Sequence, residues 1–177
     1  MIQSIVMQVM FETERLYFRK FTEADASLIL LLNSYAEVVK YVHEPILETA
    51  EQANSILLSN ILPQYALYNM GRFATYIKNT NEFIGWCGLK NRPERNEIDL
   101  GYRFIPSAWG KGFATESALK TLSYGFQHLQ LQRIIGRAHV ENSASLKVLH
   151  KTGMKYLRNE IVDECPVETY EAFNPKS

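Results

Sequence analysis

The sequence of 177 residues has only two cysteines, Cys87 and Cys165, and no CxxC pair. Two thiols this far apart are typical of a reduced cytosolic chain, where disulfides are rare. The four histidines lack the spacing of a metal site, because neither HExxH nor a Cys/His cluster occurs. We therefore expect a cytoplasmic protein with two free thiols and no metal.

Excess charge and long apolar runs are missing too. Lys and Arg total 19 and Asp and Glu total 19, unlike the strongly basic domains that bind nucleic acid. No window approaches the roughly 18–20 apolar residues of a membrane span, and the first residues lack the basic segment of a signal peptide. Nucleic-acid and membrane partners are therefore not expected. We predict one domain at residues 10–177, preceded by an N-terminal extension at residues 1–9.

What is present is an ordered series of strand and helix patterns. Strands are expected at residues 15–21, 72–78, 83–90, 97–105, 133–140, 155–162 and 167–173. Helices are expected at residues 23–33, 35–42, 50–66, 112–128 and 143–153, and Pro63 is expected to end or kink the third of them. This order predicts an α/β (α+β) fold with a mixed sheet flanked by helices.

The segment PSAWGKGFATESALKTL, residues 106–122, joins a predicted strand to an amphipathic helix. The start of a helix carries unpaired backbone N–H groups and a partial positive charge. Gly110 and Gly112 would let an anion approach those groups, and Lys111 adds a mobile charge. A phosphate-bearing cofactor is one interpretation, and a plain turn is the other. Neither a P-loop nor a GxGxxG pattern occurs, which argues against an ATP-binding domain of those types.

Four stretches in order carry a family resemblance. Residues 109–114, WGKGFA, resemble the Q/R-x-x-G-x-G/A signature of the GNAT acetyltransferase superfamily. TERLYFRKFTEADA resembles the family's first strand and helix, IDLGYRF its fourth strand, and VENSASLKVLHKTGM its second cofactor-proximal motif. The combination is similar to the Rim-type branch, the ribosomal-protein N-terminal acetyltransferases, and covers about residues 13–173.

The resemblance implies a GNAT-like fold, with a mostly antiparallel twisted sheet of about seven strands and about four helices. It also implies transfer of acetyl from acetyl-CoA to a primary amine, first of all a protein N-terminal α-amino group, by a monomer or homodimer. Polyamines, amino acids or antibiotics as acceptors, and a non-catalytic acyl-CoA-binding module, are the alternatives. The residues that the resemblance places against the cofactor are Phe104, Ile105, Trp109, Gly110, Lys111, Gly112, Phe113, Ala114, Thr115, Asn142 and Ser145.

Two positions depart from the family pattern. Trp109 stands where the signature usually has Gln or Arg, which a cradle of backbone N–H groups tolerates. Leu149 stands where many members carry a tyrosine proposed as general acid, which shifts attention to Ser145, the serine of the Rim-type branch. Ser145 could donate a hydrogen bond to the departing sulfur or cap a helix, and Asn142 could bond the pantetheine arm or cap that helix.

The implied chemistry also needs a proton acceptor, because only a neutral amine attacks a thioester. Glu97 and Asp99 lie two apart on a predicted strand, so their side chains share one face. The resemblance places this strand beside the thioester, and we favour Asp99 as base or water-positioning group, with Glu97 second. Both could equally be solvated edge acids. In the family the turn at residues 163–166 borders the acceptor site, where its acids could attract a cationic amine or simply be solvated.

Overall fold

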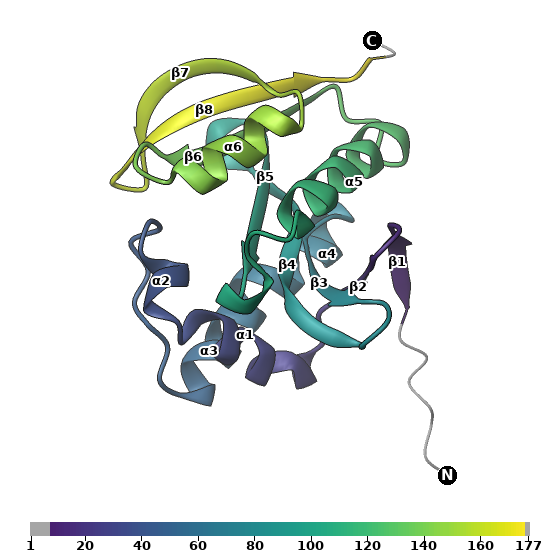
Figure 1. Ribbon diagram of the computed structural model, residues 1–177, viewed down its shortest axis with the longest axis vertical. Coiled ribbons are helices and arrows are strands. Elements are labelled where there is room, and N and C mark those ends of the chain that lie inside the picture. The colour runs from purple at the N-terminus through teal and green to yellow at the C-terminus, as the bar shows by residue number, and fades with distance from the viewer. Residues whose placement is uncertain (1–7, 176–177) are drawn as a thin grey trace.

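The computed structural model describes residues 8–175, whose strands form one 8-stranded sheet in the order β1-β2-β3-β4-β5-β6-β8-β7 (Figure 1). Every neighbouring pair is antiparallel except β5 and β6, which are parallel. The predicted mixed, mostly antiparallel sheet is thus confirmed. The strands are β1 (Val9–Glu12), β2 (Leu16–Lys20), β3 (Arg72–Ile77), β4 (Glu82–Arg92), β5 (Glu97–Phe104), β6 (Arg133–His139), β7 (Lys155–Val162) and β8 (Cys165–Phe173).

The sheet has one strand more than expected. β1 is a four-residue edge strand whose pairing with β2 is interrupted by an irregularity between Val9 and Phe11. A strand this short carries too little alternation to be recognised from sequence alone. Of the predicted N-terminal extension, residues 1–7 lie outside the described residues, and Val9 already belongs to the sheet.

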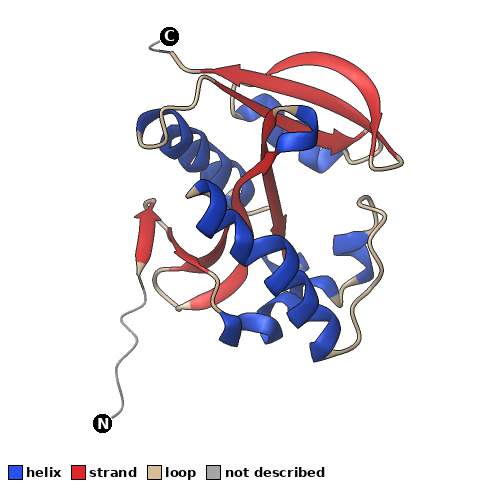
Figure 2. Ribbon diagram, turned by 180° about the vertical axis from the view of Figure 1, so that it is seen from behind, coloured by secondary structure: helices blue, strands red, loops and turns tan. Residues whose placement is uncertain are grey.

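Helices cover both faces of the sheet. α5 packs on β4 and β5 and α6 packs on β6, whereas α1 and α4 contact β4 from the other side, as the front and rear views show (Figures 1 and 2). Within residues 8–175 no helix is long and apolar enough to cross a membrane. The helices are α1 (Ala26–Asn33), α2 (Ala36–Val39), α3 (Ala50–Ile56), α4 (Leu62–Tyr68), α5 (Phe113–Gln127) and α6 (Ser143–Lys151).

The helical segment around Pro63 continues past the proline. A π-helical turn at Leu57–Ile61 joins α3 to α4, and Pro63 lies in the first turn of α4. A proline is tolerated there because its missing N–H would have no partner within that helix. The proline therefore marks an irregular junction, close to the predicted kink, and the helix ends at Tyr68.

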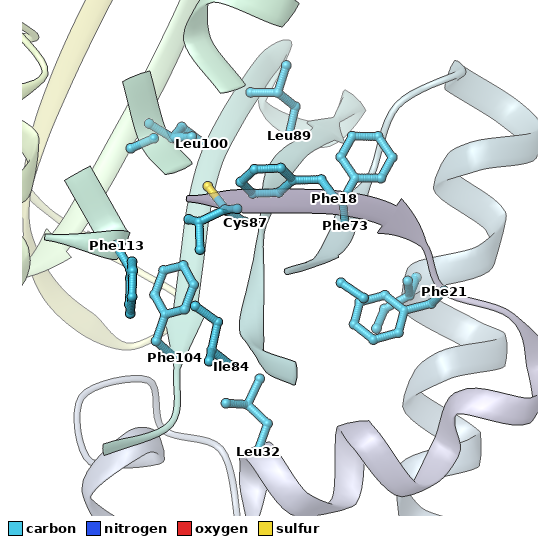
Figure 3. Packing of buried hydrophobic residues seen from close by; sticks show 14 of the residues in the cluster. Phe18, Phe21, Leu32, Phe73, Ile84, Cys87, Leu89, Leu100, Phe104 and Phe113 are labelled. Atoms are coloured by element: carbon cyan, nitrogen blue, oxygen red, sulfur yellow. The ribbon is translucent and has the colours of Figure 1, made fainter. Parts of the chain in front are cut away.

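The core lies between the sheet and these helices. Phe18, Phe73, Leu89 and Leu100 are almost completely buried, and Figure 3 shows them in one cluster with residues from several strands. Phe113, the first residue of α5, points into this cluster. Burying an aromatic ring of this size stabilises the fold by about 1.5–3 kcal/mol, and it fixes where α5 begins.

The parallel pair β5 and β6 is joined over a short length only. Their register contains two pairs, Asp99 with Ile135 and Leu100 with Gly136. Beyond Leu100, toward Phe104, the edge of β5 has no neighbouring strand, and the two strands diverge (Figure 1). The sheet therefore opens beside the segment that leads into α5.

Candidate active site

A cleft of about 1540 Å3 lies where β5 and β6 diverge. Typical ligand pockets measure about 300–1,000 Å3, so this one has room for two molecules at once. Ile105 and Lys111, both predicted to contact the cofactor, are not among the lining residues. The other predicted cofactor residues all line it: Phe104, Trp109, Gly110, Gly112, Phe113, Ala114, Thr115, Asn142 and Ser145.

The loop before α5 presents bare backbone to the cleft. Gly110 and Gly112 have φ of +72° and +81°, in the left-handed region that favours glycine. The backbone N–H groups of residues 110–115 donate no hydrogen bond within residues 8–175. A Cβ at Gly110 would meet nothing within 4 Å, so the space over the loop is open. Unpaired N–H groups at the positive end of a 15-residue helix form an anion-binding site.

The loop is held rigidly from both sides. The Trp109 indole donates to the Phe104 carbonyl at 2.7 Å, which ties the loop to the end of β5. Arg15 donates to the Lys111 carbonyl at 2.9 Å and lies 4.5 Å from the centre of the Phe113 ring. Glu116 pairs with Arg15 at 2.6 Å. Burial alone would raise the Glu116 pKa, but hydrogen bonds from Thr13 and Arg15 outweigh it and lower the pKa. Arg15 was not predicted as a site residue, because it lies almost a hundred positions from the loop.

Asn142 and Ser145 meet at the start of α6. The Asn142 side chain accepts a hydrogen bond from the Ser145 N–H at 3.1 Å, so Asn142 is the helix cap. The Tyr102 hydroxyl lies 2.8 Å from the Ser145 hydroxyl and 3.0 Å from the Ser145 carbonyl, and it can donate its single proton to either oxygen. Burial raises the pKa of Tyr102, so it stays a neutral phenol. Tyr102 was not predicted as a site residue, although its position two residues before Phe104 on β5 puts both on one face.

Leu149 does not face the cleft. It is completely buried, and a Cβ on Gly136 of β6 would lie only 2.8 Å from its side chain. The position therefore supports packing between α6 and the sheet. Ser145 and Tyr102 supply hydroxyl groups near the start of α6 that line the cleft, as does Ser143.

Asp99 and Glu97 share one face of β5, as their spacing predicts, and both pair with Arg137. Asp99 lines the cleft and also binds Arg72 at 2.9 Å, across Gly101, where a Cβ would lie 2.5 Å from Arg72 Nη1. Glu97 does not line the cleft. Burial would raise its pKa, but the hydrogen bond from Arg137 leads the effects that lower it. Of the two acids, Asp99 alone is placed to meet a ligand in the cleft.

The turn between β7 and β8 forms one rim of the cleft. Asp163 pairs with Arg92 of β4, and this hydrogen bond lowers the Asp163 pKa. The acid is therefore neutralised by a cation of the chain. Its pairing weakens the expectation that this turn attracts a cationic amine.

Residues 15–155 match the family model for an acetyltransferase (GNAT) domain. The chain belongs to the GNAT acetyltransferase family. It is 36% identical over 140 residues to an uncharacterized N-acetyltransferase, p20, from Bacillus licheniformis, and the match covers 78% of each chain. This GNAT protein is an N-acetyltransferase, which agrees with an open sheet beside a glycine loop.

Solved structures extend the likeness to the whole fold. RimL, a ribosomal L7/L12 α-N-protein acetyltransferase in complex with coenzyme A, matches with a TM-score of 0.80 and 17% identity, over 96% of this chain and 100% of that one. Spermidine N-acetyltransferase from Vibrio cholerae, in complex with CoA and spermine, matches with a TM-score of 0.76 and 19% identity, over 93% and 98%. The fold thus agrees with a Rim-type GNAT protein.

In residues 8–175 no group of three or more His, Cys, Asp or Glu is placed to hold a metal ion.

Proposed function

We propose that this GNAT protein transfers acetyl from acetyl-CoA to a primary amine, with the coenzyme diphosphate bound by the loop before α5. The observation that carries the proposal is the row of unpaired N–H groups at residues 110–115, at the mouth of a cleft with room for two substrates. The open edge of β5 offers further backbone groups to a thioester. Bound acetyl-CoA would supply an activated acetyl group, so the chain needs only to place the amine and manage protons.

In the proposed reaction, residues on one face of β5 remove the proton of the amine, and residues on the other face stabilise the leaving sulfur. Asp99 lies on the acceptor side, where a water held by its carboxylate would take the proton that the amine loses. Because Arg72 and Arg137 already pair with Asp99, the carboxylate is fixed in place. Ser145 lies on the other side, and its hydroxyl would donate a hydrogen bond to the sulfur that leaves. In this scheme Tyr102 donates its proton to the Ser145 hydroxyl oxygen, which leaves the Ser145 proton for the sulfur, and Tyr102 is a positioning residue.

The acceptor is proposed to be an α-amino group, with a protein N-terminus as the first candidate. The name of RimL supports this candidate, and the name of the Vibrio cholerae enzyme supports small amines on the same fold. A non-catalytic acyl-CoA-binding module is the second candidate, favoured by a buried leucine at position 149. Two buried free cysteines, Cys87 and Cys165, support the proposed cytoplasmic location, where thiols stay reduced.

One pair of measurements tests the proposal. Calorimetric titration with CoA measures binding, and release of CoA thiol from acetyl-CoA with a panel of amines measures turnover. We expect saturable CoA binding and amine-dependent thiol release. Binding without turnover on any amine would favour the non-catalytic module, and absence of CoA binding would refute both candidates.

A further inference from the structure

Basic side chains cover the floor of the cleft on the face of the sheet away from α5. Arg72 comes from β3, Lys90 and Arg92 from β4, and Arg137 from β6, and all four line the cleft. We call this set the basic floor. The chain as a whole is neutral, and acids that pair with the arginines offset part of the positive charge of the basic floor.

The arginines of the basic floor are occupied by acids of the chain. Arg72 is also fixed by its contact with Trp86, whose ring centre lies 4.8 Å away. Even so, Arg92 Nε and Arg137 Nη1 are buried without a hydrogen bond. The ion pairs join Asp99 to Arg72 and Arg137, Glu97 and Glu160 to Arg137, and Asp163 and Glu94 to Arg92.

Lys90 is the member of the basic floor that has no acid of its own. It is only partly exposed, and its ammonium makes no ion pair or hydrogen bond within residues 8–175. Asp99, its partner in the β4–β5 register, already binds Arg72. Burial, with Arg72 and Arg92 nearby, lowers the Lys90 pKa. Asp99 and Glu94 offset this effect only in part, so an anion in the cleft would reduce the cost of burying the Lys90 charge.

We propose that Lys90 and the basic floor bind a carboxylate carried by the acceptor itself, so that the preferred acceptors are amines with a nearby acidic group. This inference rests on the proposed function and narrows its substrate class. The carboxylate could be that of a free amino acid or an acidic side chain near a peptide N-terminus. A polyamine would instead bring positive charge against the basic floor, and Asp99 and Asp163 are already paired and offer it little compensation.

Matched acceptors test the inference on the wild-type protein. 2-Aminohexanoate and its neutral amide carry the same α-amino group and differ only in the carboxylate. The peptide arm compares an Ala-Glu with an Ala-Gln N-terminus, and spermidine is the cationic probe. A charge-assisted hydrogen bond corresponds to about a tenfold or larger effect, so kcat/KM should favour the acid of each active pair by at least that factor. Equal kcat/KM for the acid and the amide of whichever pair is acetylated, or faster turnover of spermidine, would overturn the proposal.

Variants assign the effect to one side chain. Lys90→Met should abolish the preference for the acid over the neutral amide, and Lys90→Arg should restore most of that preference. Lys155 is exposed on β7 and is not among the residues that line the cleft, so it supplies the control, because Lys155→Met removes the same charge. If Lys155→Met reduces the preference equally, net charge rather than Lys90 is responsible and the assignment is wrong.

A binding measurement separates this inference from the proposed function. Calorimetric titration with glutarate, which has no amine, reports the carboxylate site without any turnover. Lys90-dependent glutarate binding in a protein that acetylates no amine would support the basic floor and refute catalysis. Acetyl transfer without discrimination between acid and amide would support the proposed function and refute the carboxylate site.

Discussion

Replacing Gly112 with glutamate would put a carboxylate at the N-cap of α5, within the row of unpaired N–H groups. The residue has φ of +81°, and a Cβ there would lie 3.3 Å from Arg15 Nη2, the end of a flexible side chain. The change therefore fits sterically with a small shift of Arg15. A non-glycine residue in this backbone conformation costs about 1–2 kcal/mol of stability. Gly112→Gln pays the same conformational penalty and has the same shape without the charge, so it is the matched control.

The magnitude follows from Coulomb's law. Two unit charges about 5 Å apart repel by about 3 kcal/mol at an effective dielectric of about 20. Because Gly112 is exposed, water screens part of this repulsion. We expect CoA to bind at least about tenfold more weakly to Gly112→Glu than to Gly112→Gln, which corresponds to about 1.4 kcal/mol.

Calorimetric titration with CoA at low and high salt measures the difference. The Debye length falls from about 10 Å at 0.1 M salt to about 3 Å at 1 M, so the gap between the two variants should shrink as salt rises. Equal dissociation constants for Gly112→Glu and Gly112→Gln at low salt would refute the diphosphate site. A difference in CoA affinity that does not change with salt would mean that shape, not charge, is responsible.

Three further changes probe the site and the sheet around it. Asp99→Asn should slow acetyl transfer mainly at low pH, where most of the amine is protonated, and leave CoA affinity unchanged; an unaltered pH–rate profile would retire Asp99 as base. Tyr102→Phe removes the hydrogen bond to Ser145, so kcat should fall about three- to tenfold with the KM for acetyl-CoA within twofold, and a change in KM alone would contradict a positioning role. Burial opposes ionisation of Glu160, but hydrogen bonds led by that from Thr169 lower its pKa to about 2. Because an unfolded glutamate titrates near 4.3, this stability is present above that pH and is lost as the pH falls toward 2; urea midpoints should show a flatter pH dependence there for Glu160→Gln.

Much of the fold could be predicted because its signals are local. Runs of aromatic and β-branched residues mark β3 to β5, Gly112 precedes α5, and Gly153 follows α6, so the limits of these elements agree with the structure within a few residues. The family resemblance supplied the sheet type, which pairing between distant strands decides. β1 escaped prediction because a four-residue edge strand is stabilised mainly by its neighbour β2 rather than by its own pattern.

Some residues of the candidate site could likewise be predicted from local spacing, and others could not. The loop at residues 109–115 and the shared face of Glu97 and Asp99 follow from glycine spacing and strand alternation. The partners of these residues do not, because Arg15 and Arg72 reach them across long sequence separations. Sequence alone left Asp99 as a base or a solvated edge acid, and the structure shows a paired acid that lines the cleft. Tyr102 could have been considered from alternation with Phe104, but its bond to Ser145 depends on how α6 docks.

The short pairing of β5 and β6 links these features into one argument. β5 and β6 are joined at Asp99 and Leu100 and diverge beyond them. The free edge of β5 therefore has the basic floor on one face and the start of α6 on the other. Side chains alternate along a strand, so Asp99 meets the basic floor while Tyr102 meets the start of α6. A thioester along this edge would have its attacking amine on the Asp99 side and its sulfur on the Ser145 side. Proton removal and proton delivery would then occur on opposite faces of one strand, which explains why a single rigid strand can serve both ends of the transfer.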